Sequence, residues 1–361
     1  MDKAEILRCV QRAEPVMEQD LSGLDLSRED LSATVFDRCV FDGTQMNGAD
    51  LTDTQFLHCR FVRSAMSGCN AFGTVFAESA FERVVMDHAA MKNVTFYKCD
   101  VQALVLNDAT LDFVNFAQCA LHKLLLKNAA LEKVTLTDCA TGEIDLSGAK
   151  LERTVLLGCD LRQCRFEGAA FSTVVFIKCN LAGRSFAHQS FVNAQFMGAD
   201  LSGCDFSHAR IPQANFQGAK VVEASFEKAH APNAIFMEAD LAAARFDHAV
   251  LTQALFVAAK ARGARFASAD LYQSNWTGAM LPGAVLSGCE LTYADFSHAD
   301  LTNAALRGAQ MFRARLLAVT DAGARYTDRV RALESEPELL AAERWLPVPL
   351  TSRRRSAFDR V

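Results

Sequence analysis

Residues 224–256 have the sequence ASFEKAHAPNAIFMEADLAAARFDHAVLTQALF, in which an apolar residue occupies every fifth position. These positions are Phe226, Phe236, Leu241, Phe246, Leu251 and Phe256, with Ala231 as the one small residue in the series. An α-helix repeats every 3.6 residues and a strand every 2, so neither element alone produces a period of five. The stretch therefore predicts a repeat architecture in which each five-residue unit is one structural element.

The same period extends through most of the chain without an insertion or a deletion. Counting from Leu21 to Leu316 gives sixty such positions, which we call centres. Two residues before each centre lies a small residue, mostly Ala, Cys, Ser, Thr or Val. Large and small side chains thus alternate towards the inside, and such units bury their apolar side only when they stack on one another. The centres that are not large and apolar are Ala71, Thr141, Ala231 and Ala261.

The commonest complete forms of the unit are GADLSG, EADLAA and HADLTN. Over residues 21–316 this pattern resembles the A(D/N)LXX repeat of the pentapeptide-repeat family. The resemblance implies an all-β solenoid, a right-handed quadrilateral parallel β-helix with four units per coil, and hence about 15 coils of 20 residues. Residue n then stacks on residue n + 20, which predicts columns of aromatic rings at Phe166 to Phe266, Phe36 to Phe116 and Phe176 to Phe256.

The two ends of the chain predict helical caps that cover the open ends of the β-helix. Residues 1–20 contain a short helix over 2–14, with Asp2 as its N-cap and Pro15 as its stop. Residues 317–361 contain a second helix that begins with a capping box of Ser335 and Glu338 and precedes a basic tail. We therefore predict an N-terminal cap (1–20), a β-helix (21–316) and a C-terminal cap with its tail (317–361).

Composition excludes several classes of function. The 361 residues carry a net charge of −6, whereas nucleic-acid-binding domains are normally basic, so we expect no direct contact with nucleic acid. No stretch approaches 18 uninterrupted apolar residues and the charged N-terminus does not resemble a signal peptide, so we expect no membrane association. Twelve cysteines without a secretory leader indicate the reducing cytoplasm.

The cysteines and histidines do not form a recognisable chemical site. Eleven of the twelve cysteines occupy the small inward position, where a thiol packs as a small apolar group and metal ligands do not converge. His188 and His208 are predicted to stack on the outside, without the third ligand that a metal requires. An uninterrupted solenoid also lacks the pocket in which enzymes work. We predict no enzyme, no catalytic residue, no small-molecule substrate, no metal and no cofactor.

Two functional hypotheses remain. The best-known members of the family protect or inhibit DNA gyrase by resembling duplex DNA, which requires an acidic stripe along the rod. Here residues 21–170 have a net charge of −6 and residues 171–316 a net charge of +1. The outward column Asp200, Lys220, Asp240, Lys260 also alternates in sign. The favoured interpretation is a bacterial, non-enzymatic scaffold that binds proteins, with gyrase mimicry as the alternative.

The C-terminal region suggests a narrower version of the scaffold hypothesis. The segments ALRGAQMFRARL and ELLAAERWLP weakly resemble bacterial pentapeptide-repeat proteins encoded beside type VI secretion effectors and their adaptors. The resemblance covers fewer than 40 residues. It implies an accessory, adaptor or immunity-type role in type VI secretion.

One side of the predicted β-helix differs from the other three. Residues that flank a centre point outward, and on three sides they are mixed in character. On the side with centres at 36, 56 and 76 they are mostly apolar over six coils, about 300 Å² of flat surface. We predict that a protein partner or a second copy of the chain binds there. The predicted interface residues are Val155, Leu157, Val175, Ile177, Met197, Ile235, Met237, Leu255 and Val257.

Two residues do not fit the inward pattern. Arg184 and Gln189 occupy the small position, where a long polar side chain is costly to bury. We predict a local distortion of the wall over 182–190, with Arg184 turned outward or paired with an acid such as Asp205.

Overall fold

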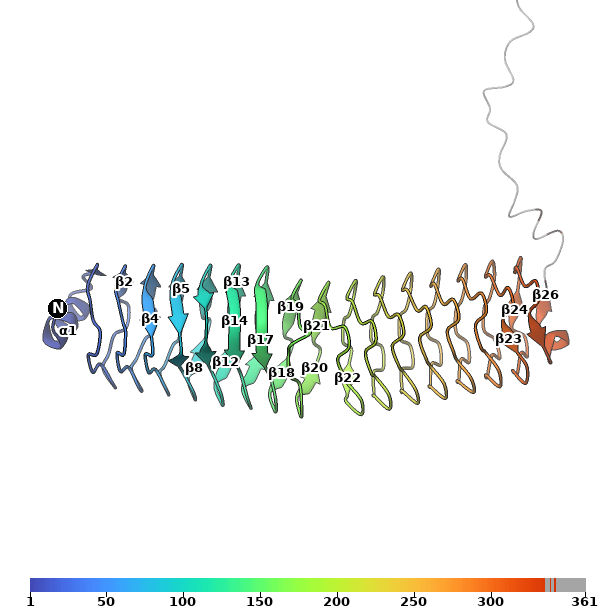
Figure 1. Cartoon of the computed structure of the whole chain (residues 1–361), viewed down its shortest axis with the longest axis horizontal. Coiled ribbons are helices and arrows are strands. Elements are labelled where there is room, and N and C mark those ends of the chain that lie inside the picture. The colour runs from blue at the N-terminus through green and yellow to red at the C-terminus, as the bar shows by residue number, and fades with distance from the viewer. Residues whose placement is uncertain (335–337, 339–340, 342–361) are drawn as a thin grey trace, which may run out of the picture.

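The computed structural model describes residues 1–334, 338 and 341, and it shows a long rod of stacked coils (Figure 1). Each coil takes 20 residues and pairs in parallel with the next, as Val16 does with Phe36. The rod has about 16 turns. This exceeds the 15 counted from Leu21, because Val16 is already a buried centre in the ladder and the last strand ends at Glu334. The predicted right-handed, four-sided parallel β-helix is confirmed.

We number the four sides of the coil by their centres: Phe36 lies on the first side, Phe41 on the second, Met46 on the third and Leu51 on the fourth. The first side holds a nine-stranded sheet. Its strands are β1 (Val16–Met17), β2 (Val35–Asp37), β3 (Gln55–Leu57), β5 (Val75–Ala77), β9 (Thr95–Tyr97), β13 (Asn115–Ala117), β16 (Thr135–Thr137), β19 (Val155–Leu157) and β21 (Val175–Ile177).

The second and third sides share a seven-stranded sheet, and the fourth side holds a six-stranded one. The shared sheet contains β4 (Arg60–Val62), β6 (Ala80–Glu82), β7 (Val84–Val85), β10 (Asp100–Val101), β11 (Leu104–Val105), β14 (Ala120–Leu125) and β17 (Ala140–Asp145). The fourth side contains β8 (Ala90–Lys92), β12 (Thr110–Asp112), β15 (Ala130–Glu132), β18 (Lys150–Glu152), β20 (Ala170–Ser172) and β22 (Phe191–Val192).

The coils after Val192 are built differently. Up to residue 304 they are held by isolated parallel bridges, such as Gln195 with Asn215 and Leu255 with Asn275. Two short strand pairs follow at the C-terminal end of the rod. They are β23 (Ala305–Leu306) with β25 (Arg325–Tyr326), and β24 (Arg315–Leu316) with β26 (Leu333–Glu334).

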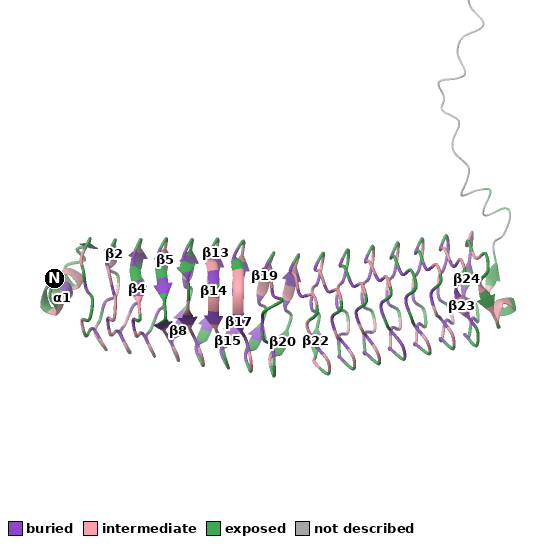
Figure 2. Cartoon of the chain, in the orientation of Figure 1, coloured by how far each residue is buried: buried purple, intermediate pink, exposed green. Residues whose placement is uncertain are grey.

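The centres form one continuous core inside the rod, drawn in purple in Figure 2. Every centre from Leu21 to Leu316 is buried except Thr141. The predicted aromatic columns are present: Phe216 and Phe236 stack with ring centroids 4.7 Å apart and an interplanar angle of 2°. The one loose contact in these columns joins Phe166 to Phe186, whose rings are 5.7 Å apart and tilted by 49°.

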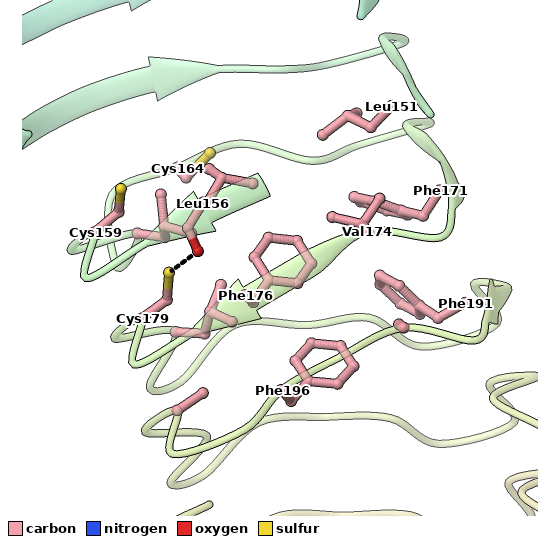
Figure 3. Packing of buried hydrophobic residues seen from close by; sticks show 14 of the residues in the cluster. Leu151, Leu156, Cys159, Cys164, Phe171, Val174, Phe176, Cys179, Phe191 and Phe196 are labelled. Atoms are coloured by element: carbon pink, nitrogen blue, oxygen red, sulfur yellow. Dashed lines mark hydrogen bonds between the residues drawn. The ribbon is translucent and has the colours of Figure 1, made fainter. Parts of the chain in front are cut away.

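The small inward residues have a hydrogen-bonding role as well as a packing role. The Cys179 thiol donates to the carbonyl oxygen of Leu156, at 3.2 Å (Figure 3). The hydroxyl of Thr44 makes the same contact with the carbonyl oxygen of Leu21, at 2.9 Å. In both cases the acceptor is a centre 23 residues earlier. Cysteine, serine and threonine therefore suit this position because they are small and satisfy a carbonyl of the neighbouring coil.

The N-terminal end of the rod is covered by α1 (Lys3–Gln11). The predicted N-cap is confirmed, since the backbone N–H of Glu5 donates to Asp2 Oδ1 and the N–H of Asp2 donates to Glu5 Oε2. Ile6 is fully buried and joins the core of the first coils. The helix ends at Gln11, three residues before the predicted end.

At the other end, a short 3₁₀ helix, η1 (Arg329–Arg331), precedes β26. Of the second predicted helix and the basic tail, only Glu338 and Ala341 belong to the described residues. In the part of the chain that the structure describes, no helix is long and apolar enough to cross a membrane.

Candidate functional site

The nine predicted interface residues lie together on the first side. Val155 and Leu157 belong to β19, and Val175 and Ile177 belong to the adjacent strand β21. Isolated bridges extend the same register through Gln195 and onwards to the rows of Ile235 and Leu255. All nine side chains are half-buried. The predicted residues therefore occupy two neighbouring columns of one sheet face, one directly before the centres and one directly after them.

The absence of charge distinguishes this face from the other three. From Gln55 to Thr277, no residue directly before or after a first-side centre is Asp, Glu, Lys or Arg. The nearest charged residues in these two columns are Asp37 and Asp295. The other sides are charged, as shown on the second side by the ion pair of Lys220 with Asp200, at 3.2 Å. We call the two columns from Gln55 to Thr277 the uncharged face.

The uncharged face is longer than the predicted interface. It also includes Leu57, Val75 and Tyr97. Tyr97 is 38 % exposed, and Lys98 Nζ lies 5.1 Å from the centroid of its ring. The prediction missed these residues because it followed aliphatic side chains over six coils. The sequence signal that finds them is the lack of charge down both columns.

One border of this face is also uncharged over the C-terminal half of the rod. The residues at that corner are polar and mostly amides, and Gln253 Nε2 donates to Gln273 Oε1 at 2.9 Å. Amide groups both donate and accept hydrogen bonds, and burying them does not require removing an ion from water. The border therefore widens the surface available to another polypeptide. Its residues are Thr173, Asn193, Gln213, Asn233, Gln253 and Gln273.

The expected distortion at Arg184 is present. Arg165 bridges Asp145, and Ser185 bridges Asp205, but among the described residues no bridge joins Arg165 to Ser185. Both Arg184 and Gln189 are half-buried. Arg184 Nη1 donates to the carbonyl oxygen of Cys164 at 3.3 Å instead of pairing with Asp205. Gln189 Nε2 donates to the carbonyl oxygen of Phe166 at 3.4 Å. The predicted distortion of the wall is therefore confirmed, whereas the suggested pairing of Arg184 with Asp205 was wrong, because the side chain reaches a carbonyl of the previous coil.

The wall also changes at the corner between the second and third sides. At nearly every corner the second residue after a centre has a left-handed backbone, as Gly203 does with a φ of +64°. Four consecutive coils lack this turn, and β14 and β17 run through the corner as six-residue strands. Thr141 lies in β17, where its hydroxyl donates to the carbonyl oxygen of Asp160 and accepts from the N–H of Asp160. The four corner residues are Ala103, Lys123, Glu143 and Gln163.

Two hollows adjoin this corner. The first has a volume of about 270 Å³ and is lined by Thr141, Gly142, Asp160, Arg162 and Gln163. There Arg162 is paired with Asp160, at 2.6 Å. The second has about 370 Å³, and in it Arg184 Nε and Gln189 Oε1 are buried without a hydrogen-bond partner.

The cysteines pack as predicted. All twelve are free, and all but Cys9 are buried. Burial raises the pKa of Cys69, Cys204 and Cys289 to about 12, so these thiols are protonated and poorly nucleophilic at neutral pH.

The predicted stack of His188 on His208 is present, with ring centroids 4.8 Å apart and an angle of 9°. Within residues 1–334, 338 and 341, no group of three or more His, Cys, Asp or Glu side chains is placed to hold a metal ion.

Comparison with protein-family models gives one family. A model of pentapeptide repeats matches eight times, over residues 20–53, over 143–176, and through overlapping matches over 179–316. These segments cover more than half of the chain. The chain belongs to the pentapeptide-repeat family. The matched segments leave out residues 54–142, although the coils of this pentapeptide-repeat protein continue through them.

Comparison with solved structures gives other pentapeptide-repeat proteins at low TM-scores, and these likenesses carry no argument. HetL, a pentapeptide-repeat protein of the cyanobacterium Nostoc sp. strain PCC 7120, is 18% identical, with 88% of this chain and 98% of HetL covered and a TM-score of 0.17. Full-length QnrB1, a plasmid-mediated fluoroquinolone resistance protein, is 13% identical, with 91% and 98% covered and a TM-score of 0.21. Among functionally curated proteins, no match was found.

Proposed function

We propose that this pentapeptide-repeat protein is a non-enzymatic scaffold that binds proteins, and that the uncharged face is its contact surface. The observation that supports the proposal is the absence of Asp, Glu, Lys and Arg from both columns between Gln55 and Thr277. The other sides have ion pairs, such as Arg245 with Glu227 at 3.0 Å on the third side. Charged residues are not disfavoured on a face that stays in water. They are disfavoured on a protein-contact surface, because removing water from an ion is costly.

The size and shape of the face suit a protein partner. Twelve rows at a strand spacing of about 4.8 Å, on a face about 10 Å wide, give roughly 550 Å². A specific protein interface buries about 800 Å² on each partner, so the face and its amide border together approach the area required. The stacked core beneath the face holds these columns rigid, so binding costs little ordering of the backbone.

Gyrase mimicry receives less support. It requires an acidic stripe, and the clearest charged column on the second side alternates in sign, with Lys220 paired to Asp200. An accessory or adaptor role in type VI secretion rests on the resemblance of the C-terminal segments alone. Location in the cytoplasm is supported by the twelve free thiols.

Site-specific photo-cross-linking tests the proposal. A photoreactive phenylalanine analogue replaces Met237 on the uncharged face, or Val285 on the third side as the matched control. Both native residues are half-buried neighbours of a centre. In cells that make the protein naturally, we expect a discrete cross-linked product from position 237 and none from position 285. Equal products from both positions, or none from either, would contradict the proposed contact surface.

A further inference from the structure

The column directly before the first-side centres has a symmetric order. From residue 55 to residue 275, in steps of 20, it reads Gln, Val, Thr, Asn, Thr, Val, Val, Gln, Asn, Ile, Leu, Asn. The middle of this series lies between Val155 and Val175, which pair in adjacent strands. The order of polar and apolar residues is nearly the same when read from the middle towards either end of the rod.

The matching residues lie at equal distances from the middle. Val155 corresponds to Val175, and Val75 corresponds to Leu255. The amides also correspond, Asn115 to Asn215 and Gln55 to Asn275, and Thr135 corresponds to Gln195. Of the six pairs, only Thr95 with Ile235 joins a polar residue to an apolar one. The coils of Asp37 and Asp295, where charge first appears, are also equally far from the middle.

A surface with this symmetry is what a two-fold axis requires, because each copy then presents the same patch in opposite directions. We propose that a second copy of this chain covers the uncharged face, with the two rods antiparallel and the two-fold axis passing between β19 and β21. The proposal rests on the proposed function, since it names the partner of the same face. In the column before the centres it matches polarity in five of six pairs, whereas in the column after them three of six pairs join a polar to an apolar residue, as Thr137 with Met197 does.

The antiparallel arrangement explains the order of residues better than a parallel one. In a parallel two-fold pair each row faces the same row of the second copy, with the column before the centres against the column after them, so a symmetric order along the rod has no role. Only an antiparallel pair needs the order to be symmetric about the middle. The contact area clears the lower limit: roughly 550 Å² on each copy gives about 1,100 Å² in total, above the ~1,000 Å² minimum of a specific interface, and the amide border brings it closer to the standard size.

Charges at the two ends of the face are neutralised within each chain. Asp37 accepts from His58 Nδ1 at 2.9 Å and lies 3.4 Å from Arg38 Nη1. Asp295 pairs with Arg315, at 3.2 Å. The antiparallel contact therefore ends at ion pairs that are already formed, and it leaves no isolated charge facing the second copy.

Disulfide trapping tests this arrangement. Thr137→Cys and Met197→Cys are made as two separate variants in a Cys9→Ser background, where the other eleven cysteines are buried. In the antiparallel pair residue 137 faces residue 197 of the second copy. Two copies of residue 137 lie three coils apart, about 14 Å, beyond the ~7 Å limit between the Cα atoms of a disulfide. We expect cross-linked dimers after oxidation of the mixture and none from either variant alone.

The opposite results would overturn the proposal. Cross-links from each variant alone, without any gain on mixing, would indicate a parallel pair. A mixture that stays uncross-linked would exclude the antiparallel contact, whether light scattering finds one chain or two. In that case a photo-cross-link from position 237 to a different polypeptide would still support the proposed protein-contact surface. If that cross-link were also absent, both the contact surface and the antiparallel dimer would be excluded.

Discussion

Two regions of the rod build the same square coil by different local means. From Val35 to Ile177 most sides are strands, usually of three residues, whereas from residue 193 to 304 isolated bridges alternate with turns. The inward centres are buried in both regions. The two regions therefore share buried centres but differ in the small inward position, which is mostly Cys, Thr, Ser or Val before residue 180 and nearly always Ala after residue 193.

The residue before the centre contributes to the turn form where it has a side-chain acceptor, although Ile235 and Leu255 also precede turns without one. In the turn-built region Asp205 Oδ1 accepts from the N–H of Ser207 at 2.9 Å, and Asn215 Oδ1 does the same with Gln217. This local bond turns the chain directly after the centre. In the strand-built region Val75 occupies the equivalent place and has no acceptor, so Ala77 stays extended and pairs with Tyr97. The Asp of the A-D-L motif is thus a turn signal, while the Leu is the core signal.

The largest expected effect is in the core, where the two regions also differ in side chains. Phe216→Ala removes a ring that stacks on Phe196 at 5.0 Å and on Phe236 at 4.7 Å, and we expect a loss of about 3–5 kcal/mol in the free energy of unfolding. Leu136→Ala, in the aliphatic coils of the strand-built region, should cost less. Urea denaturation of both variants measures the difference. A loss under about 1 kcal/mol for Phe216→Ala would contradict the packed aromatic column.

A second pair of substitutions compares the two kinds of corner. An added Cβ at Gly142 would lie 2.4 Å from the carbonyl oxygen of His122, which is backbone and cannot move away. We expect Gly142→Ala to cost about 2–3 kcal/mol through overpacking. Gly203→Ala meets open space and bears only the strain of its φ of +64°, about 1 kcal/mol. Thermal unfolding of both variants ranks them, and the reverse order would show that the strand-built corner is adaptable.

The turn signal itself can be removed at Asp205. Asp205→Ala deletes the acceptor for Ser207 N–H and should cost about 1 kcal/mol, by analogy with the loss of a helix cap. Asp205→Asn is the matched control, because its side-chain oxygen still accepts the bond. Chemical denaturation of the three proteins provides the comparison. If the Ala and Asn variants are equally stable, the hydrogen bond is not what directs the turn.

The smallest expected effect concerns a turn contact inside the strand-built region. Burial alone would raise the pKa of Asp145, but hydrogen bonds from Ser147 and the charge of Lys127 outweigh it and hold that pKa below its ordinary value. A lowered folded-state pKa adds stability above the ordinary value, and this stability is lost as the pH falls through the folded-state pKa. Asp145→Asn should therefore lower stability at pH 7 by less than about 1 kcal/mol, and the difference should disappear as the pH falls through the folded-state pKa of Asp145. Urea titrations at several pH values measure it, and a difference independent of pH would exclude the charge as its cause.

Much of the fold follows from the sequence because the period of five has no alternative structure. It identifies the buried centres, the stacked rings of Phe216 and its neighbours, and the inward cysteines. The cap at Asp2 follows from a local motif. The continuous strands at the second corner were not predicted, because the fit of Gly142 depends on a backbone oxygen 20 residues away. The distortion near Arg184 was predicted from its size and polarity, but its acceptor was missed for the same reason, since that acceptor is on the previous coil.

The candidate site follows from the sequence only in part. Alternation along the repeat identifies the nine outward residues between Val155 and Val257, and the structure brings them into two columns. The full length of the uncharged face, from Gln55 to Thr277, becomes clear once the columns are aligned coil by coil and charge is examined alongside hydrophobicity. Which residue lies opposite each position of the uncharged face depends on a second chain. The period of one chain does not specify that contact.

The central claim is that the uncharged face is a protein-contact surface, and one measurement tests it most directly. The measurement is sedimentation velocity of the labelled protein in an extract of its own cells. It compares two double variants. One carries Ile177→Lys and Met237→Lys on the uncharged face, and the other carries Val105→Lys and Val285→Lys on the third side. All four native residues are half-buried, so both double variants disturb the wall equally. We expect the wild type and the third-side variant to sediment as a complex, and the variant of the uncharged face to sediment as a single chain. If the variant of the uncharged face sediments like the wild type, that face is not the contact surface.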